Sequence, residues 1–413
     1  MTHRVVVTGL GAVTPLGTDV ESTWAGLLAG RSGAGPITKF DPARLHVRFA
    51  CEVKGFDPSR YMDKKEARRY DLFAQFALAA AHQAITQAGL EGKVPVPERT
   101  GVIIGSGIGG MQTYEENCSI YLTKGPDRVS PFFVPMYIPD IAAGLVSMRY
   151  GLRGPNFCTV SACASSAHAL GEAYTMIRTG MADAMVGGGS EAAITGLTVA
   201  GFQNMKALST RNDSPETASR PFDLDRDGFV LGDGAAVVML ESLEHARRRG
   251  ARILGEMIGY GLSADAHHLT QPAPEGRGAA QAMRDCLADG KIALEDVGYI
   301  NAHGTSTPQG DVAETQAVKA VFGERAHQLV FGSTKSMTGH LLGGAGALEF
   351  LISLLVTTCG VIPPTTNQFT PDPECDLPSA PNEKLNREVK VALSNSFGFG
   401  GHNVTLAVKR FEE

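Results

Sequence analysis

Thr159-Val-Ser-Ala-Cys163-Ala-Ser-Ser-Ala167 joins two segments of opposite character. Residues 156–160 predict a short buried strand, and the Ala-rich, proline-free residues 164–179 predict a helix that ends at Gly180. Cys163 is therefore expected where a strand turns into a helix, near the positive end of the helix dipole and its unpaired N–H groups. Both features favour the thiolate, the form that attacks carbonyl carbon, although most single buried cysteines are only small packing residues.

Strands and helices alternate along the rest of the chain, and the pattern begins again after residue 250. This alternation predicts an α/β fold made of two duplicated halves, residues 1–250 and residues 251–413. The expected strands cover residues 5–8, 100–105, 184–188 and 235–240, then 252–260, 297–300, 329–331, 389–394 and 404–409. The expected helices cover residues 19–29, 64–88, 139–150 and 243–249, then 276–288, 311–322 and 344–357.

Three residues with reactive side chains follow predicted strands directly. They are Cys163 in the first half and His303 and Lys335 in the second. Parallel α/β sheets place active groups beyond the carboxyl ends of their strands. We therefore expect the two halves to build one shared site.

Composition narrows the class of protein. The chain has 413 residues, of which 43% are hydrophobic, and its net charge of −6 argues against a general nucleic-acid binder. Seven cysteines without a C-x-x-C pair indicate a reducing compartment and no disulfide framework. The first strand is expected at residue 5, which leaves no room for a signal peptide, and the apolar residues 348–358 are expected to form a buried helix too short to span a membrane. A cytoplasmic location is therefore expected.

Four motifs stand in a specific order. They are Ser161-Ala-Cys163-Ala-Ser165, Asn301-Ala-His303-Gly-Thr305-Ser-Thr307-Pro-Gln-Gly-Asp311, Lys335-Ser-Met-Thr-Gly-His340-Leu-Leu-Gly and Asn395-Ser-Phe-Gly-Phe399-Gly-Gly401. Together they resemble the β-ketoacyl-[acyl carrier protein] synthases, and the match is nearest to the type II synthase of bacterial fatty-acid elongation. The resemblance extends over the whole chain, from Val5 to the last predicted strand.

The resemblance implies a thiolase-like fold, with two halves related by a pseudo-twofold axis and stacked as helix–sheet–helix–sheet–helix layers, in a homodimer. It implies an acyltransferase of fatty-acid biosynthesis that catalyses a decarboxylating Claisen condensation. Cys163 accepts an acyl chain from acyl carrier protein as a thioester. Malonyl-carrier protein then loses CO2, and its carbanion attacks that thioester to give a β-ketoacyl chain two carbons longer. No cofactor is implied, because the phosphopantetheine arm of the carrier protein holds both substrates.

The residue types suit this chemistry. Decarboxylation places negative charge on the malonyl thioester oxygen, and His303 and His340 supply two imidazole donors, each worth about 3–4 kcal/mol of barrier if preorganised and neutral. Lys335 and Glu349 are expected to form a partly buried ion pair that orients His340. The family pattern assigns the backbone N–H groups of Cys163 and Phe399 to the second oxyanion.

The resemblance also implies residues that bind the substrate and the carrier protein. Thr305 and Thr307 match positions that hydrogen-bond the phosphopantetheine arm, and Phe399, between glycines, is predicted to gate the acyl pocket. Asp265, His268 and Thr270 match a mobile loop beside that gate, and Ile108 and Phe202 match the lining of the acyl tunnel. An acidic carrier protein is expected to dock on six cations: Lys64, Lys65, Arg68, Arg69, Arg128 and Lys206.

Other motifs are weaker. Gly105-x-Gly107-x-x-Gly110 matches a dinucleotide pattern, but residues 111–121 are a poor match to the helix that should follow. Asp223-x-Asp225-x-Asp227-Gly228 resembles half of a calcium loop, yet Gly234 replaces the bidentate Glu, so a turn is the better interpretation. Cys163, His303 and His340 could ligate zinc, which would quench the nucleophile.

Rival functions share most of these residues. A polyketide ketosynthase uses the same chemistry, as do the short-chain type I and mycolic-type synthases, whereas a non-catalytic chain-length partner would lack Cys163. A thiolase would use a second cysteine where Phe399 stands. Two departures from the family pattern are visible: Ser166 replaces the usual Gly, which we expect to narrow the tunnel entrance or the dimer contact behind it, and His402 replaces Thr.

Overall fold

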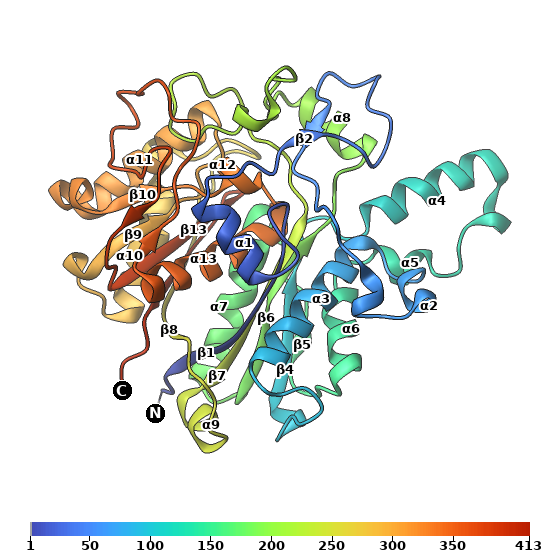
Figure 1. The fold of residues 1–413 in the computed structure, drawn as a ribbon, viewed down its shortest axis with the longest axis horizontal. Coiled ribbons are helices and arrows are strands. Elements are labelled where there is room, and N and C mark those ends of the chain that lie inside the picture. The colour runs from blue at the N-terminus through green and yellow to red at the C-terminus, as the bar shows by residue number, and fades with distance from the viewer. Residues whose placement is uncertain (1) are drawn as a thin grey trace.

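A computed structural model of the chain describes residues 2–413, which fold around one ten-stranded sheet (Figure 1). The strand order is β10-β9-β13-β14-β8-β1-β7-β6-β4-β5. The first half supplies β1 (Val5–Val13), β4 (Thr100–Gly105), β5 (Asn156–Phe157), β6 (Ala184–Glu191) and β7 (Gly234–Ser242). The second half supplies β8 (Gly255–Ala264), β9 (Val297–Asn301), β10 (Val330–Gly332), β13 (Val391–Gly398) and β14 (His402–Lys409).

The two halves have the same topology. In the first half β1–β7 and β7–β6 are antiparallel, while β6–β4 and β4–β5 are parallel. The second half repeats this order, with β8–β14 and β14–β13 antiparallel and β13–β9 and β9–β10 parallel. The halves join where β1 pairs with β8, from Val5 opposite Met257 to Val7 opposite Gly255. The predicted duplication is therefore confirmed strand by strand.

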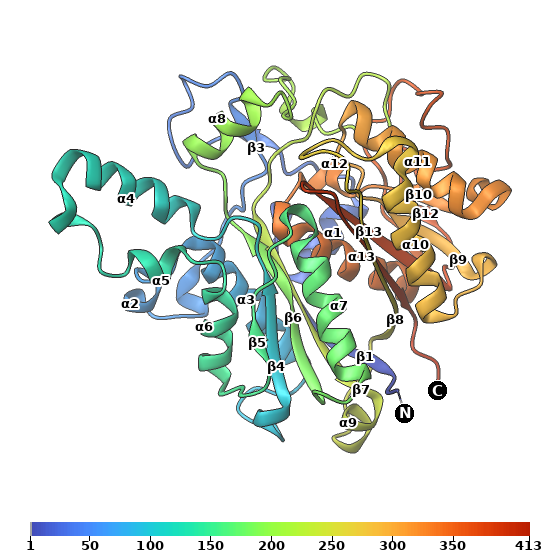
Figure 2. The same ribbon diagram turned by 180° about the vertical axis from the view of Figure 1, so that it is seen from behind.

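Helices form three layers around the two half-sheets (Figures 1 and 2). Helices α7 (Ser165–Arg178) and α13 (Ala345–Cys359) lie between the halves and share a core with β1, β7, β8 and β14. Helices α3 (Leu72–Gln87) and α6 (Ile141–Tyr150) cover the outer face of the first half. Helices α10 (Arg277–Gly290) and α11 (Pro308–Phe322) cover the outer face of the second.

The central helix α13 is more apolar than the sequence analysis anticipated. The segment Leu342–Cys359 has a mean hydropathy of 1.6 over 18 residues, enough in length and composition to cross a membrane, which corrects the prediction that this apolar stretch is too short to do so. However, 83% of this segment is buried inside the protein. It is hydrophobic on all sides because both half-sheets pack against it.

Shorter elements connect this framework. The helices are α1 (Val20–Leu28), α2 (Lys64–Ala67), α4 (Met111–Lys124), α5 (Phe133–Tyr137), α8 (Gly196–Asn204), α9 (Leu243–Arg248) and α12 (Lys335–Thr338). The strands are β2 (Gly35–Pro36), β3 (Phe49–Ala50), β11 (Val361–Ile362) and β12 (Leu385–Asn386).

Three predicted elements differ from the structure. The single helix expected over residues 64–88 is two helices, because Asp63 caps α2 and Asp71 caps α3, and each aspartate starts a new helix. Residues 111–124 form a helix, α4, which projects from the body of the protein, so it lacks the apolar periodicity of a packed helix (Figures 1 and 2). The strand expected over residues 156–160 ends at Phe157, and Val160 is 60% exposed.

Candidate active site

Cys163 lies in the 3-10 turn Ala162–Ala164 immediately before α7. The preceding residue, Ala162, has a φ of 50°, a left-handed conformation that L-residues adopt only when their surroundings enforce it. Cys163 belongs to an apolar cluster of buried residues that includes Phe229 and Leu342, and 9% of it is exposed. The nucleophile expected from the sequence is therefore buried in an apolar environment at the start of a helix.

A cavity of about 550 Å³ opens at Cys163 and is lined by both halves. Most of the predicted catalytic and substrate-binding residues line it: Ile108, Cys163, Phe202, Asp265, Thr270, His303, Thr305, Thr307, His340 and Phe399, with Lys206 among them. Lys335, Glu349 and His268 do not line it, nor do the other predicted docking residues Lys64, Lys65, Arg68, Arg69 and Arg128. Among residues 2–413, no group of three or more His, Cys, Asp and Glu is placed to hold a metal ion.

The two imidazoles are close neighbours in this cavity. The ring centroids of His303 and His340 are 5.3 Å apart, with the ring planes at 84°. Burial, followed by the positive charge of Lys335, lowers the pKa of both histidines well below the usual value, so both rings are neutral. Within the described part of the chain, Nδ1 of His303 and both ring nitrogens of His340 are buried without a hydrogen-bond partner.

Lys335 and Glu349 lie behind the imidazoles. Lys335 is 1% exposed, and its Nζ contacts Oε1 of Glu349. Burial raises the pKa of Glu349 to about 7, against the opposing effect of the Lys335 charge. The lysine therefore acts on the two histidines through its charge rather than by touching the cavity.

Glu314 is a site residue that the sequence analysis missed. This buried residue of α11 lines the cavity and accepts hydrogen bonds from the backbone N–H groups of His303 and Gly304, both at 2.9 Å, and from Nδ2 of Asn395 at 3.0 Å. Burial raises the pKa of Glu314 to about 7. It fixes the backbone of His303, and its only sequence signal is an acid one helical turn after Asp311.

The expectation that its surroundings make Cys163 a thiolate is wrong for this structure. Burial raises the pKa of Cys163 to about 12, and the charge of Lys335 and the backbone N–H of Phe399 oppose this effect only in part. Desolvation of a thiolate outweighs a helix dipole, because full burial shifts a pKa by up to about 3–5 units and a dipole is worth about 0.3–2 kcal/mol. The free protein therefore holds a protonated thiol.

The hydroxyls of Thr305 and Thr307 lie side by side, 3.1 Å apart, on the cavity wall. Ser306 between them has a φ of 69° and is fixed from three sides. Its N–H donates to Asp311, its hydroxyl accepts from the N–H of Arg220, and its carbonyl accepts from the N–H of Gly228. This turn directs both threonine side chains into the cavity.

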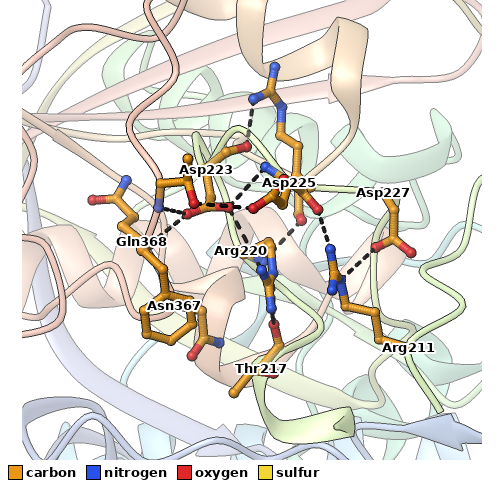
Figure 3. A network of polar contacts seen from close by, with 12 residues as sticks. Arg211, Thr217, Arg220, Asp223, Asp225, Asp227, Asn367 and Gln368 are labelled. Atoms are coloured by element: carbon orange, nitrogen blue, oxygen red, sulfur yellow. Dashed lines mark hydrogen bonds and ion pairs between the residues drawn. The ribbon is translucent and has the colours of Figure 1, made fainter. Parts of the chain in front are cut away.

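The aspartates of the calcium-like pattern take part in a structural network (Figure 3). Asp223 accepts hydrogen bonds from the N–H groups of Phe369 and Thr370 at 2.6 and 2.7 Å and from the N–H of Asp225 at 3.0 Å. Asp227 pairs with Arg211 at 3.6 Å. The interpretation of this stretch as a turn with Asx contacts is confirmed, since the first carboxylate already holds its own loop and the 369–370 segment.

The glycine pattern at residues 105–110 also has an internal partner. Ser106 Oγ and the N–H groups of Gly107 and Ile108 all donate to the carboxylate of Glu191. The prediction that no helix follows this pattern was wrong, because α4 does. Rejection of a dinucleotide site stands for a different reason: the N–H groups that would bind a pyrophosphate already bind Glu191.

The two predicted mobile loops are hydrogen-bonded to each other. The N–H of Asp265 donates to Gly401 O at 2.9 Å, and the N–H of Gly400 donates to Leu269 O at 2.8 Å. The Phe399 ring lies 6.5 Å from that of Phe202, centroid to centroid. His268 is exposed and accepts a hydrogen bond from the N–H of Thr270 within its own loop. It does not line the cavity, although the resemblance placed it among the substrate-binding residues beside the gate.

Ser166 does not narrow the cavity entrance. It is fully buried where the starts of α7 and α13 meet, and its Oγ accepts a hydrogen bond from the N–H of Ala347 at 2.9 Å. The expectation that Ser166 narrows the tunnel entrance is therefore wrong, whereas its effect on a dimer contact stays a prediction. The hydroxyl instead satisfies a backbone donor in the first turn of α13, which lacks a side-chain cap of its own.

The predicted docking cations are exposed on the molecular surface. Lys64, Lys65, Arg68 and Arg69 lie on α2 and directly after it, and the Arg69 guanidinium stacks 4.7 Å from the centre of the Phe132 ring. Arg128 follows α4, and Lys206 follows α8 at the edge of the cavity.

Comparison with known proteins gives one consistent result. The chain matches the family described as beta-ketoacyl synthase, N-terminal domain, over residues 2–246, and beta-ketoacyl synthase, C-terminal domain, over residues 254–369. A 3-oxoacyl-[acyl-carrier-protein] synthase 2 of Synechocystis sp. is 52% identical over 409 residues, covering 99% of this chain and 98% of that protein. The protein of the same name from Coxiella burnetii is 51% identical over 408 residues, covering 99% of each.

Solved structures agree with these relatives. A beta-ketoacyl synthase from Burkholderia phymatum is 37% identical, with a TM-score of 0.93 over 99% of this chain and 100% of that one. The ishigamide ketosynthase/chain length factor is 34% identical, with a TM-score of 0.94 over 100% of both chains.

The chain therefore belongs to the beta-ketoacyl synthase family. It is a condensing acyltransferase of the kind that elongates acyl chains in fatty-acid synthesis. The resemblance, the thiolase-like fold and the condensing activity predicted from the sequence are confirmed.

Proposed function

We propose that Cys163 carries the growing acyl chain as a thioester and that His303 and His340 stabilise the enolate formed from a malonyl thioester. The observation that carries this proposal is the set of three buried ring nitrogens without partners in the cavity of Cys163. Buried polar atoms are almost always paired in proteins. A neutral imidazole has a single N–H, and because neither nitrogen of His340 has a partner, the N–H of His340 is unpaired whichever nitrogen carries it. That N–H suits an acceptor that arrives with the substrate, such as a thioester oxygen.

In the first half-reaction the sulfur of Cys163 attacks the thioester carbonyl of an acyl-carrier protein. The bond from that carbonyl to the pantetheine sulfur breaks, and the proton lost from Cys163 ends on the released pantetheine thiol. The backbone N–H of Phe399, which faces the sulfur, and that of Cys163 itself bind the tetrahedral oxyanion. The exchange takes up and releases no net proton, because one thiol is consumed and another is formed.

In the second half-reaction malonyl-carrier protein occupies the same cavity. Its carbon–carboxylate bond breaks, CO2 leaves, and the electron pair moves to the thioester oxygen facing the two imidazoles. The resulting carbon attacks the Cys163 thioester and forms the new carbon–carbon bond, the bond to the Cys163 sulfur breaks, and the thiolate takes up a proton from water. Neutral rings suit this step, since each presents a fixed N–H and Lys335, paired with Glu349, supplies positive potential behind them.

The substrates arrive on acyl carrier protein and no bound cofactor takes part. Thr305 and Thr307 hydrogen-bond the phosphopantetheine arm, Ile108 and Phe202 line the acyl tunnel, and Phe399 gates it. Support for the carrier comes from the solved complex of a type II PKS acyl-carrier protein with its ketosynthase, whose chain is 34% identical with a TM-score of 0.91. The docking surface is formed by Lys64, Lys65, Arg68, Arg69, Arg128 and Lys206, and Asp265, His268 and Thr270 move with the gate.

The first half, residues 1–250, supplies the nucleophile, and the second half, residues 251–413, supplies the histidines, Lys335 and the gate. The enzyme is a cytoplasmic homodimer. Support for the dimer comes from apolar side chains exposed on α4 and α5, among them Leu122 at 80% and Val134 at 58%, and from the free outer edge of β5. Sedimentation at several protein concentrations tests the dimer.

A polyketide ketosynthase is the second candidate function, favoured by the ishigamide ketosynthase/chain length factor among the similar structures. Fatty-acid elongation is preferred, because the identity to the 3-oxoacyl-[acyl-carrier-protein] synthases is 52% and that to the ishigamide protein is 34%. A non-catalytic chain-length partner is disfavoured by the presence of Cys163. One condensation per acyl chain, rather than an unreduced poly-β-keto product, separates the first two candidates.

Mass spectrometry tests the assignment of Cys163. Incubation with acyl-carrier protein should add the acyl mass to the peptide that contains Cys163, and Cys163→Ala should abolish this adduct. His303→Ala should retain the adduct and lose the condensation product. An adduct on any other cysteine, or none at all, would remove Cys163 from the mechanism.

A further inference from the structure

Glu191, the last residue of β6, is a fully buried carboxylate surrounded by hydrogen-bond donors. Its Oε2 accepts from the N–H of Gly107 at 2.7 Å and from the N–H of Gly343 at 3.0 Å. Its Oε1 accepts from Ser106 Oγ at 2.8 Å and from the N–H of Ile108 at 3.2 Å. One side chain therefore joins a loop of the first half to a turn of the second.

The donor set identifies the bound form as an anion. Three of the four donors are backbone N–H groups, which can only donate, and an ionised carboxylate is the side chain that only accepts. No Lys, Arg or His among residues 2–413 forms an ion pair with Glu191, so the three N–H groups and the Ser106 hydroxyl compensate its charge. Burial raises the pKa of Glu191 and these hydrogen bonds oppose the effect.

The duplication of the fold explains why such donors exist here. The turn Leu342–Gly344 precedes α13 just as the turn Ala162–Ala164 precedes α7, and the first residues of the two turns have φ values of 46° and 50°. Gly343 therefore corresponds to Cys163. The end of β13, which belongs to the second half, faces the turn of Cys163 in the first half. The end of β6, which belongs to the first half, places Glu191 against the N–H of Gly343 in the second half.

The joined loop forms part of the cavity wall. Gly107, Ile108 and Leu342 all line the cavity of Cys163. The fit is tight: a Cβ added at Gly343 would lie 2.2 Å from the nitrogen of Gly107, and one added at Gly107 would lie 3.4 Å from Ala162 O. A small shift of this loop therefore changes the space beside the sulfur.

We propose that the turn Leu342–Gly344 is a second anion-binding turn, the duplicate of the turn that carries Cys163, and that the Glu191 carboxylate is the anion it binds. Glu191 is then the positioning residue that holds Gly107 and Ile108, the part of the cavity wall that faces the acyl chain, in place. Its part in acyl selection rests on the proposed role of Cys163. Without this carboxylate the wall is no longer joined to Gly343. Binding of long acyl chains is then impaired, whereas decarboxylation of the malonyl group is retained.

Glu191→Gln is the sharpest test, because an amide is of similar size but offers one acceptor oxygen and turns an NH2 group toward backbone donors. The variant should acylate Cys163 with palmitoyl-carrier protein at least about tenfold more slowly, since small displacements of a binding wall have effects of this size. Acetyl transfer and malonyl decarboxylation should change by less than about twofold. Peptide-resolved mass spectrometry measures the first two, and CO2 release measures the third.

Two further variants keep the test decisive. Glu241→Gln neutralises another fully buried glutamate, which pairs with Arg249 and His245 away from the cavity, and should leave the acyl-chain profile unchanged. Ser106→Ala removes one hydrogen-bond donor to Glu191 and retains the charge of the carboxylate. It should slow acylation of Cys163 by long acyl chains as Glu191→Gln does, but by a smaller factor. This variant tests the proposal if Glu191→Gln does not fold. Wild-type profiles in both the Glu191 and Ser106 variants, or an equal loss of acyl transfer and decarboxylation, would overturn the proposal. Failure of the wild type to acylate Cys163 would instead refute the proposed function.

Discussion

Cys163, the proposed nucleophile, is a buried thiol that is not ionised in the free protein. Burial raises the pKa of Cys163 to about 12, so the thiol is protonated at neutral pH. The cationic Lys335 and the N–H of Phe399 lower this pKa, yet burial remains the largest effect. In the proposed mechanism, Cys163 therefore becomes reactive only when a substrate carbonyl enters the cavity and its oxygen accepts hydrogen bonds from the backbone N–H groups.

The pH dependence of alkylation tests this account at the level of one residue. The rate of Cys163 modification by iodoacetamide should rise about tenfold for each pH unit through the neutral range, because only the thiolate reacts. No plateau should appear below about pH 9, since the folded-state pKa lies far above it. Mass spectrometry of the peptide that contains Cys163 follows the rate.

Cys359 serves as the internal control for this experiment, since it is exposed and is modified in the same sample. Its modification reports the reagent and the integrity of the protein at each pH. A plateau for Cys163 near neutral pH would show that the thiolate forms in the free enzyme and that burial is outweighed.

At the level of elements, buried ion pairs attach the loop that carries Thr305 and Thr307. Arg226 donates from Nη2 to Pro308 O at 2.8 Å and from Nε to Thr307 O at 3.2 Å, and its Nη1 contacts Asp372 at 2.5 Å. Asp311 lies 3.6 Å from the same guanidinium. One arginine thus joins the cavity-lining segment to the 223–226 turn and to the loop of Asp372.

Removal of the Arg226 charge should be strongly destabilising. Arg226→Gln leaves the buried Asp311 and Asp372 uncompensated, and breaking a buried pair in this way costs about 3–5 kcal/mol of unfolding free energy. Arg211→Gln is the matched control, because its pair with Asp227 is one-third exposed and worth at most about 1 kcal/mol (Figure 3). The shift of the urea midpoint measures both. Equal shifts for the two variants would contradict a special role for Arg226.

Some of the secondary-structure elements could be predicted from the sequence and others could not. The strand–turn–helix unit of Cys163 and the duplicated alternation were predictable, because apolar periodicity and glycine positions are local signals. The helix α4 was missed, since it projects from the body and has no apolar face to detect. The partnership of Glu191 with Gly343 was not predictable, because 152 residues separate them and only the fold brings the acid to the turn.

For the whole molecule, duplication supplies two equivalent turns, and the halves use them differently. One turn carries Cys163 and opens into the cavity, whereas the other is filled by Glu191. The second half supplies His303, His340 and Phe399 to the cavity that holds Cys163, so both halves are needed to line it. The net charge of −6 is a further whole-molecule feature, because it would repel an acidic partner, so the proposed docking surface depends on its local basic charge.

Charge reversal on α2 tests that patch. Lys65→Glu combined with Arg68→Glu should raise KM for acyl-carrier protein about tenfold or more, because two exposed attractions become repulsions facing an acidic protein. The kcat at saturation should stay within about twofold, since neither residue lines the cavity. Added salt should narrow the difference between wild type and variant, because ions screen exposed charges.

Two comparisons separate docking from a general effect of charge. Lys384→Glu alters an exposed lysine next to β12, on the opposite side of the molecule from α2, and should leave KM unchanged (Figure 2). A pantetheine thioester without the carrier protein should react equally well with all variants, because it reaches the cavity without touching α2. If the double reversal leaves KM for the carrier-bound substrate unchanged, the basic face of α2 is only a solvated surface and the carrier docks elsewhere.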